Sequence, residues 1–269
     1  MREITDLNEF KEIQLDILKY VHKFCKKHDI KYSLGYGTLI GAVRHNGFIP
    51  WDDDIDIIMR RNEYERFIEL FSKEKGRYKV LSHSNQKNYP LAYAKVSDEL
   101  TLKKEDVNND VERGLDIDVF PIDDLPDDNE AVKKQFRRCK LLSNILSLKQ
   151  VKVNKKRSFY KNLVLMCGRL FFAWYPMNKL ISDISKNAQR YNGCKGRMCA
   201  QMVAYIYKEK EIHPRQYSDS YTELIFEDEL YPVISGYDAY MRQIYGDYMK
   251  LPPTEKQVSH HGFKAFWRD

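Results

Sequence analysis

The most informative part of the sequence is YSLGYGTLIGAVRHNGFIPWDDDIDIIM, residues 32–59. Near its end, carboxylate and apolar residues alternate from Asp54 to Ile58. Such alternation is typical of a half-buried strand, so Asp54 and Asp56 are predicted to leave one face while the isoleucines pack behind them. Same-face neighbours lie roughly 7 Å apart at the backbone, so their carboxylates could share one divalent cation or flank a pair. The pattern therefore predicts a metal site.

A phosphate site is predicted just upstream of these carboxylates. Residues 32–34 are predicted to form a short strand, and Gly37 and Thr38 to open a short helix over residues 39–44 with Thr38 as its N-cap. Free backbone N–H groups at the positive end of a helix bind phosphate well. Arg44, on the same helix, is predicted to neutralise charge on that phosphate.

A calcium loop is the main alternative for the acidic run. Asp52, Asp54, Asp56 and Glu63 have the spacing of positions one, three, five and twelve of an EF-hand. Position six would be Ile57, however, where the loop requires glycine. We therefore set this alternative aside.

A second acidic strand is predicted at residues 114–123, GLDIDVFPID. It brings Asp116 and Asp118 to one face, and either could supply the third acid that two-metal phosphoryl transfer uses. An amphipathic strand with a wet face is the structural alternative. Lys95, on a strand predicted over residues 91–96, would either meet a phosphate or be exposed at a sheet edge.

Three motifs resemble the LicD family, bacterial phosphocholine transferases that are related to the fukutin-related sugar-phosphate transferases. They are GTLIGAVRHNGFIPWDDDIDI at 37–57, GLDIDVFPID at 114–123 and YGDYMKLPP at 245–253. The resemblance implies an α+β fold, with a nucleotidyltransferase-like mixed β-sheet core covered by helices and a mainly helical second half. It also favours Asp118 over Asp116 as the third carboxylate, and a functional role for Lys95.

The carboxylates themselves imply metal-assisted phosphoryl transfer, and the resemblance further implies the donor and the acceptor. Phosphocholine would move from CDP-choline to a hydroxyl of a surface glycan precursor, such as a lipid-linked teichoic acid or lipopolysaccharide unit, and CMP would leave. Asp54, Asp56 and Asp118 would be the catalytic, metal-binding residues, with Mg²⁺ as the expected ion and Mn²⁺ as its substitute. Aromatic faces suit the quaternary ammonium of choline, and Trp51, Tyr248 and Trp267 are the candidates.

Composition predicts a soluble globular protein, with 269 residues, 43% hydrophobic and 31% charged. Five scattered cysteines without a C-x-x-C motif, and the lack of an apolar signal core, lead us to expect a cytoplasmic location. We expect a catalytic core over residues 1–130, a basic and mainly helical lobe over 131–224, and a C-terminal segment, 225–269, that packs back on the core. Asp6 and Glu9 are a candidate capping box for a helix over residues 6–28.

Charge is distributed unevenly along the chain. Residues 98–130 hold thirteen Asp and Glu against three Lys and Arg, whereas residues 131–182 hold thirteen Lys and Arg and no acid. The basic segment is predicted to form two helices joined by a lysine-rich loop that contains Lys152, Lys155, Lys156 and Arg157. It could lie on an anionic membrane surface or be a buried part of a second lobe. No nucleic-acid-binding module accompanies this charge, so we expect no nucleic-acid partner.

Three other functions fit parts of the pattern. A glycosyltransferase could use an Asp-x-Asp pair to hold a nucleotide sugar. A nucleotidyltransferase would consume a nucleoside triphosphate and release pyrophosphate. An adaptor without enzymatic activity could use only the basic segment, at a membrane surface.

Overall fold

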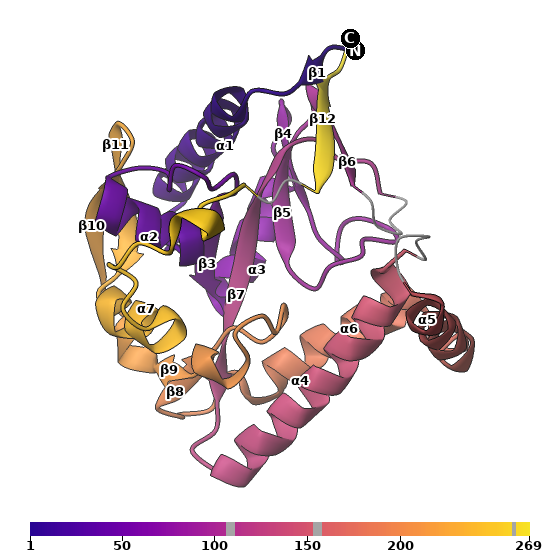
Figure 1. Ribbon diagram of the computed structural model, residues 1–269. Coiled ribbons are helices and arrows are strands. Elements are labelled where there is room, and N and C mark those ends of the chain that lie inside the picture. Colours follow the sequence, from indigo (N-terminus) through magenta and orange to yellow (C-terminus); the bar gives the residue numbers. More distant parts are fainter. Residues whose placement is uncertain (106–110, 153–157, 260–261) are drawn as a thin grey trace.

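The structure, a computed structural model, describes residues 1–105, 111–152, 158–259 and 262–269. The fold is α+β, as predicted: a curled mixed sheet is packed between helices, with a smaller sheet beside it (Figure 1).

The central sheet has the strand order β2-β3-β7-β5-β4. β3 and β7 are parallel, whereas β2 is antiparallel to β3, and β5 is antiparallel to both β7 and β4. β7 is the longest strand, and its far end also pairs with β8, which pairs with β9. The strands are β2 Ser33–Leu34, β3 Asp56–Arg60, β4 Tyr78–Leu81, β5 Ala94–Asp98, β7 Asp116–Leu125, β8 Met198–Ala200 and β9 His213–Pro214.

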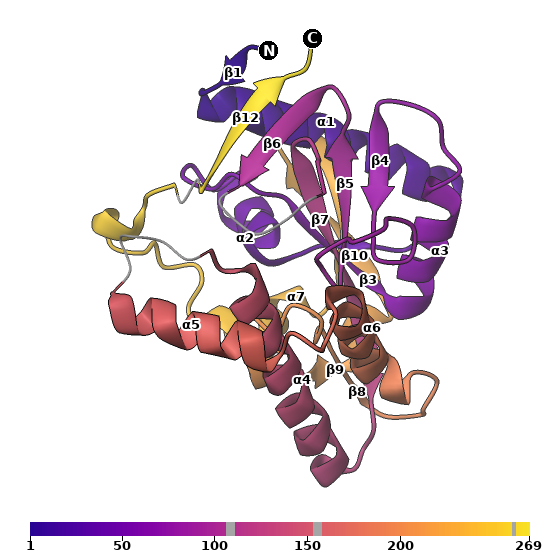
Figure 2. The same cartoon turned by 90° about the vertical axis from the view of Figure 1, so that its right-hand side faces the viewer.

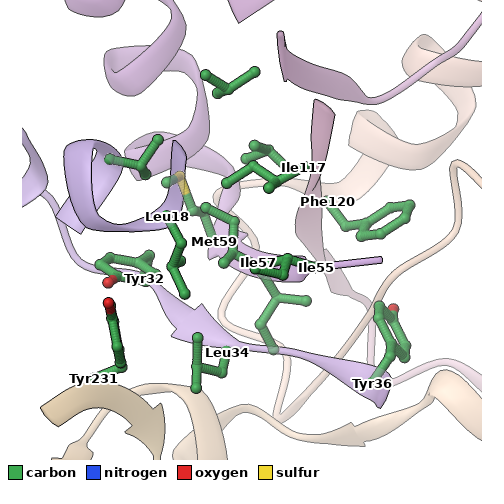
Figure 3. Close-up of a cluster of buried hydrophobic side chains, with 14 of the residues drawn as sticks. Leu18, Tyr32, Leu34, Tyr36, Ile55, Ile57, Met59, Ile117, Phe120 and Tyr231 are labelled. Atoms are coloured by element: carbon green, nitrogen blue, oxygen red, sulfur yellow. The ribbon is translucent and has the colours of Figure 1, made fainter. Parts of the chain in front are cut away.

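Helices α1 (Leu7–Lys27) and α3 (Arg61–Phe71) cover one face of this sheet. Ile57 of β3 and Ile117 of β7 are fully buried on this side, near Leu18 of α1 (Figure 3). Because side chains alternate along a strand, Asp56 and Asp118 leave the opposite face. The predicted division of β3 and β7 into an apolar and a carboxylate face is therefore confirmed.

The start of α1 agrees only in part with the predicted capping box. Asp6 is the N-cap and accepts a hydrogen bond from the backbone N–H of Asn8. Glu9 does not reach back to the cap, because its carboxylate accepts hydrogen bonds from Arg2 and from the indole N–H of Trp267. The helix therefore has one of the two reciprocal bonds.

The short helix of the first motif begins earlier than predicted. α2 runs over Tyr36–His45, with Gly35 as its N-cap. Thr38 lies inside the first turn, and its hydroxyl accepts a hydrogen bond from the backbone N–H of Asp56 at 2.8 Å. The prediction of Thr38 as the N-cap was wrong, because this hydroxyl joins α2 to β3 instead.

The basic segment forms three helices where two were predicted. They are α4 (Asn129–Gln150), α5 (Phe159–Phe171) and α6 (Met177–Ala188). Pro176 is the N-cap of α6, and proline disfavours a helical residue before it, which separates α5 from α6. Of the predicted lysine-rich loop, residues 155–157 lie outside the described residues.

The second half also contains strands that the sequence did not reveal. Besides β8 and β9, it forms an antiparallel hairpin, β10 (Tyr221–Phe226) and β11 (Glu229–Ile234), which is followed by α7 (Tyr237–Tyr245). Short 3₁₀ helices η1 to η4 lie at Gln189–Tyr191, Lys208–Glu211, Arg215–Ser218 and Thr254–Lys256.

A second sheet brings the two ends of the chain together. β12 (Phe263–Trp267) lies between β1 (Glu3–Ile4) and β6 (Thr101–Glu105), and both pairings are antiparallel. Figures 1 and 2 both show the termini side by side above the central sheet. This sheet places the C-terminal strand next to the carboxylate face of the central sheet.

Within the described ranges, no helix combines the length and the apolar character that crossing a bilayer requires. All five cysteines are free thiols, as the absence of a cysteine framework led us to expect.

Candidate active site

The site is built on three adjacent strands of the central sheet. Asp56 of β3 is directly opposite Asp118 of the parallel strand β7, and Asp118 is opposite Lys95 of β5. Neighbouring strands lie about 4.8 Å apart, so these three side chains form one row across the sheet. Two carboxylates from segments about sixty positions apart in sequence are therefore neighbours, with a lysine beside them.

A cavity of about 400 Å³ lies over this row. Trp51, Asp54, Lys95 and Asp118 line it, whereas Asp56 of the same row is not among the lining residues. Its other walls come from α1, the loop before β3, β6, β7, η4 and β12. These further lining residues are Gln14, Asp52, Asp53, Ile55, Lys103, Asp116, Lys256, Val258 and Phe263.

The loop before β3 carries an acid that the sequence analysis left aside. β3 begins at Asp56, so Asp54 lies in the loop. The prediction that Asp54 lies on the strand was wrong. Asp52, in the same loop, points at the first turn of α2: a Cβ added to Gly37 would lie 2.6 Å from its Oδ2 atom. Gly37 is thus required for the close approach of this carboxyl group. The helix end predicted to bind phosphate has the Asp52 carboxyl group beside it.

Crowding raises the pKa values of these acids. Burial and the neighbouring Asp54 carboxyl group raise the pKa of Asp52 to about 7. Burial, followed by repulsion from Asp54 and Asp118, raises the pKa of Asp56 well above its usual range. The pKa of Asp54 is raised too, by desolvation of its carboxyl group among the neighbouring acids and by the charge of Asp53, although the residue as a whole is exposed. Among the described residues, no Lys or Arg forms an ion pair with Asp54 or Asp56.

Asp116 has the opposite environment, although it is only two residues from Asp118. Its carboxylate pairs with Lys95 at 3.0 Å, Lys103 at 3.2 Å and Arg113 at 2.9 Å. These three cations hold the pKa of Asp116 well below its usual range in spite of its burial. The carboxylate of Asp116 is therefore already neutralised by Lys95, Lys103 and Arg113, which it holds in position. Asp118 faces the cavity with one cationic partner, Lys95.

Three lysines supply positive charge to the cavity. Lys95 was predicted from sequence, whereas Lys103 of β6 and Lys256 of η4 were not. Lys103 lies over the ring of Phe263, with its Nζ atom 4.3 Å from the ring centroid. No polar–apolar alternation in TLKKE marks Lys103, and nothing near Lys256 in the sequence marks it as a site residue.

Arg44 lies away from the cavity lining. Its guanidinium donates one hydrogen bond to the backbone carbonyl of Tyr248 at 2.7 Å and another to the ring of His45. Arg44 thus connects the first motif to the YGDYMKLPP motif. The structure does not bring it together with Lys95 and Asp118.

Of the three aromatic candidates for a choline site, Trp51 alone lines the cavity among the described residues. Tyr248 is buried, and its hydroxyl donates to Asp238 at 2.7 Å. Trp267 donates to Glu9 at 2.8 Å, and its ring lies under Arg77. Both have structural partners away from the cavity.

The donor set fits a hard divalent cation such as Mg²⁺. Clustered carboxylates whose mutual repulsion raises their pKa values gain from a cation between them. Among the described residues, no three Asp, Glu, His or Cys side chains are arranged as a ready-made cage. Mg²⁺ does not require one, because it is usually bound by one or two carboxylates together with substrate phosphates and water.

Comparison with known proteins identifies the family. A model described as the LicD/FKTN/FKRP nucleotidyltransferase domain matches residues 29–166. A Haemophilus influenzae protein named lipopolysaccharide cholinephosphotransferase LicD is 31% identical over 276 residues, which cover 99% of each chain. The chain belongs to the LicD family.

Two further proteins match shorter parts of the chain. Uncharacterized proteins of Rickettsia typhi and Rickettsia prowazekii are 48% and 52% identical over 59 and 48 residues. These matches cover 21% and 18% of this chain and 19% and 18% of the Rickettsia proteins. The LicD domain match contains the row Asp56, Asp118 and Lys95, while Gln14 and the C-terminal wall of the cavity lie outside it.

Proposed function

We propose that this LicD-family chain is a transferase that moves phosphocholine from CDP-choline to a hydroxyl group of a cell-surface glycan precursor and releases CMP. The observation that carries the proposal is the row of Asp56, Asp118 and Lys95 across the sheet, beside a cavity that is lined by both acids and lysines. The Haemophilus influenzae relative is named for cholinephosphate transfer to lipopolysaccharide and matches over nearly its whole length.

Asp54, Asp56 and Asp118 are the residues that would hold Mg²⁺, or Mn²⁺ in its place. When bound, the ion would neutralise charge on the donor's phosphates. The first turn of α2 would add its N-terminal partial positive charge nearby.

Lysines would bind the donor's remaining phosphate charge. Lys95 is buried and held in position by Asp116 and Asp118, so it presents a fixed positive charge at the row. Lys103 and Lys256 line the same cavity from β6 and η4. Charge that is fixed before the substrate arrives stabilises the developing negative charge without reorganisation.

The transfer itself needs a positioned hydroxyl group and a base. The acceptor oxygen would attack the phosphorus of the phosphocholine group, and the bond from that phosphorus to the bridging oxygen would break. CMP would leave with the bonding electrons, and the hydroxyl proton would pass to a carboxylate, for which we propose Asp118 because it faces the cavity.

Trp51 is the residue that we propose for choline recognition. Its ring lines the cavity next to the acidic loop, so a quaternary ammonium there would meet both an aromatic face and negative charge.

The acceptor that we propose is a lipopolysaccharide or teichoic acid unit, in a lipid-linked or polymeric form. A lipid-linked acceptor would bring the chain to an anionic membrane surface from the cytoplasmic side.

A panel of donors tests the proposed function. The purified protein with Mg²⁺ is heated with CDP-choline, other CDP-alcohols, UDP-sugars or nucleoside triphosphates. We expect the largest increase in melting temperature with CDP-choline, because a ligand that binds only the folded state stabilises it. We also expect CMP release when choline-free lipopolysaccharide is added.

The panel also separates the alternatives. Stabilisation by a UDP-sugar alone would indicate a glycosyltransferase, and pyrophosphate release from a triphosphate would indicate a nucleotidyltransferase. No response to any donor would contradict the proposal. The remaining alternative would then be an adaptor without enzymatic activity.

A further inference from the structure

Helix α5 is amphipathic, but its apolar side faces outward and its polar side faces the protein, which is the opposite of most surface helices. Its outward side carries seven large apolar residues that are between 45% and 78% exposed, whereas Leu165 is its one buried large apolar residue. At about 100° per residue, these positions, together with the exposed Cys167, fall within an arc of roughly 160°. The seven residues are Phe159, Tyr160, Leu163, Val164, Met166, Leu170 and Phe171.

The polar side of α5 faces the protein. Arg169 donates to the backbone carbonyls of Leu148 and Val151, at the end of α4. Gly168 packs against the Leu148 side chain, where an added Cβ would lie 3.3 Å from the nearest carbon. Figure 2 shows α5 crossing the end of α4 at the outside of the molecule. The helix is thus fixed to α4 by polar bonds and a close contact, with its apolar arc turned outward.

This apolar surface is concentrated in one place. Of the seventeen large hydrophobic residues that are exposed among the described residues, eight lie between Phe159 and Trp174. Single exposed apolar residues are ordinary, but a contiguous patch of this kind usually marks a surface that binds something.

The surrounding charge indicates what covers the patch. The segment 131–182 contains thirteen Lys and Arg and no Asp or Glu. A symmetric dimer formed through α5 would bring two such basic segments together, and like charges oppose that contact. Anionic lipid headgroups attract the same segment.

The types of residue also suit a lipid surface. Phe159 and Tyr160 lie at the start of the helix, Trp174 lies just beyond its end, and Leu, Val and Met lie between. Aromatic residues favour the headgroup region, and a helix with this distribution lies in the plane of the interface. We propose that α5 is a membrane-docking helix that inserts its outward apolar arc into the surface of an anionic bilayer.

This inference extends the lipid-linked acceptor of the proposed function, but its test does not depend on catalysis. Wild-type protein is sedimented with vesicles of phosphatidylglycerol and phosphatidylcholine, and with pure phosphatidylcholine vesicles. We expect binding to the anionic vesicles, and a reduction of about tenfold or more in the triple variant Val164→Gln, Leu170→Gln, Phe171→Ser. The matched control, Ile225→Gln with Leu230→Gln, removes two exposed apolar residues from the β10–β11 hairpin and should bind as the wild type does.

A second measurement locates the contact. An environment-sensitive dye on Cys167, in a Cys194→Ser background, should shift its emission to the blue with anionic vesicles. A dye on Thr222→Cys, in a background that also carries Cys167→Ser, should not. Equal vesicle binding by the triple variant and the wild type, or no wild-type binding, would overturn the proposal.

A third outcome would replace the lipid by a second copy of the chain. In that case the wild type would be a dimer that the triple variant dissociates, and the dye on Cys167 would be insensitive to vesicles. Transfer to a lipid-free acceptor fragment, measured on the same triple variant, should equal that of the wild type. Failure of docking is therefore distinguishable from failure of the proposed transferase activity.

Discussion

Two groups of acids on the central sheet are in opposite electrostatic states: a paired end, at Asp123 and Asp124 of β7, and an unpaired end, at Asp56 where β3 begins. At the paired end, Asp123 accepts two hydrogen bonds from Arg61, at 2.8 and 2.7 Å, and Asp124 pairs with Arg60. At the unpaired end, Asp56 lies opposite Asp118 and has no cationic partner among the described residues, whereas Asp118 itself pairs with Lys95. Paired acids stabilise a fold, whereas crowded acids without partners cost free energy that a bound ligand can recover.

The buried state of Asp123 fits this difference. Asp123 is fully buried, and its carboxylate accepts hydrogen bonds from both Arg61 and Asn192. Acids on one sheet can thus stabilise the fold or serve a bound ligand. Those that pair with a buried arginine are structural, whereas those without such a partner are available to a ligand.

The largest expected effect is on turnover, at the unpaired end. Asp56→Asn should lower the rate of phosphocholine transfer by about 10³-fold, because it removes a charge that the transition state needs. Its melting temperature should stay the same or rise, because burial and repulsion already penalise the ionised form of Asp56. Rate and melting temperature are measured on the same preparation. A stable variant with wild-type turnover would remove Asp56 from the site.

A second effect, similar in free energy but on stability, is expected at the paired end. Asp123→Asn leaves the buried guanidinium of Arg61 without its bidentate partner, which should lower the free energy of unfolding by about 3–5 kcal/mol. Urea unfolding followed by circular dichroism measures this loss. The control is Asp228→Asn at the exposed pair with Lys19, for which no measurable change is expected. If both variants behave alike, the buried pair of Asp123 with Arg61 contributes no more to stability than an exposed pair does.

The smallest expected effect depends on pH and involves the buried His213 beside the paired end. Its Nδ1–H donates to the Glu211 carbonyl, and its Nε2 accepts from Ser218 and Cys199. Burial, with a contribution from Arg60, lowers its pKa to about 4. Unfolding restores a pKa near 6.5, so the unfolded chain binds more protons between these values and His213 makes folding less favourable as pH falls.

The variant His213→Gln isolates this contribution. The difference in unfolding free energy between wild type and variant should be larger at pH 7.5 than at pH 4.5, by about 2–3 kcal/mol. Using the difference cancels other titrating groups, such as Glu211, whose pKa burial raises to about 8. A difference that does not change with pH would mean that His213 is not held neutral by its surroundings.

Local patterns predicted the acidic half of the site. The alternation around Asp56 and Asp118 is a property of strands alone, so both strands and their inward and outward faces could be inferred. The row that joins them could not, because it depends on the pairing of β3 with β7 and of β7 with β5. For the same reason, the cations that occupy Asp116 were not foreseen: Lys103 comes from β6, which reaches the site only through the second sheet.

The direction of α5 lay beyond sequence analysis for a different reason. Amphipathic periodicity shows that a helix has an apolar side, but not whether that side meets the protein core or the exterior. Gly168 and Arg169 settle the direction here, through contacts with α4 that lie about twenty residues away in sequence.

Binding of Mn²⁺ in the presence of CDP-choline, followed by electron paramagnetic resonance, tests the central claim most directly. The account predicts that the wild type and the Asp228→Asn control bind the ion, and that Asp56→Asn and Asp118→Asn bind it at least about tenfold more weakly. Equal binding by all four proteins, or none by the wild type, would contradict the assignment of these carboxylates to a metal.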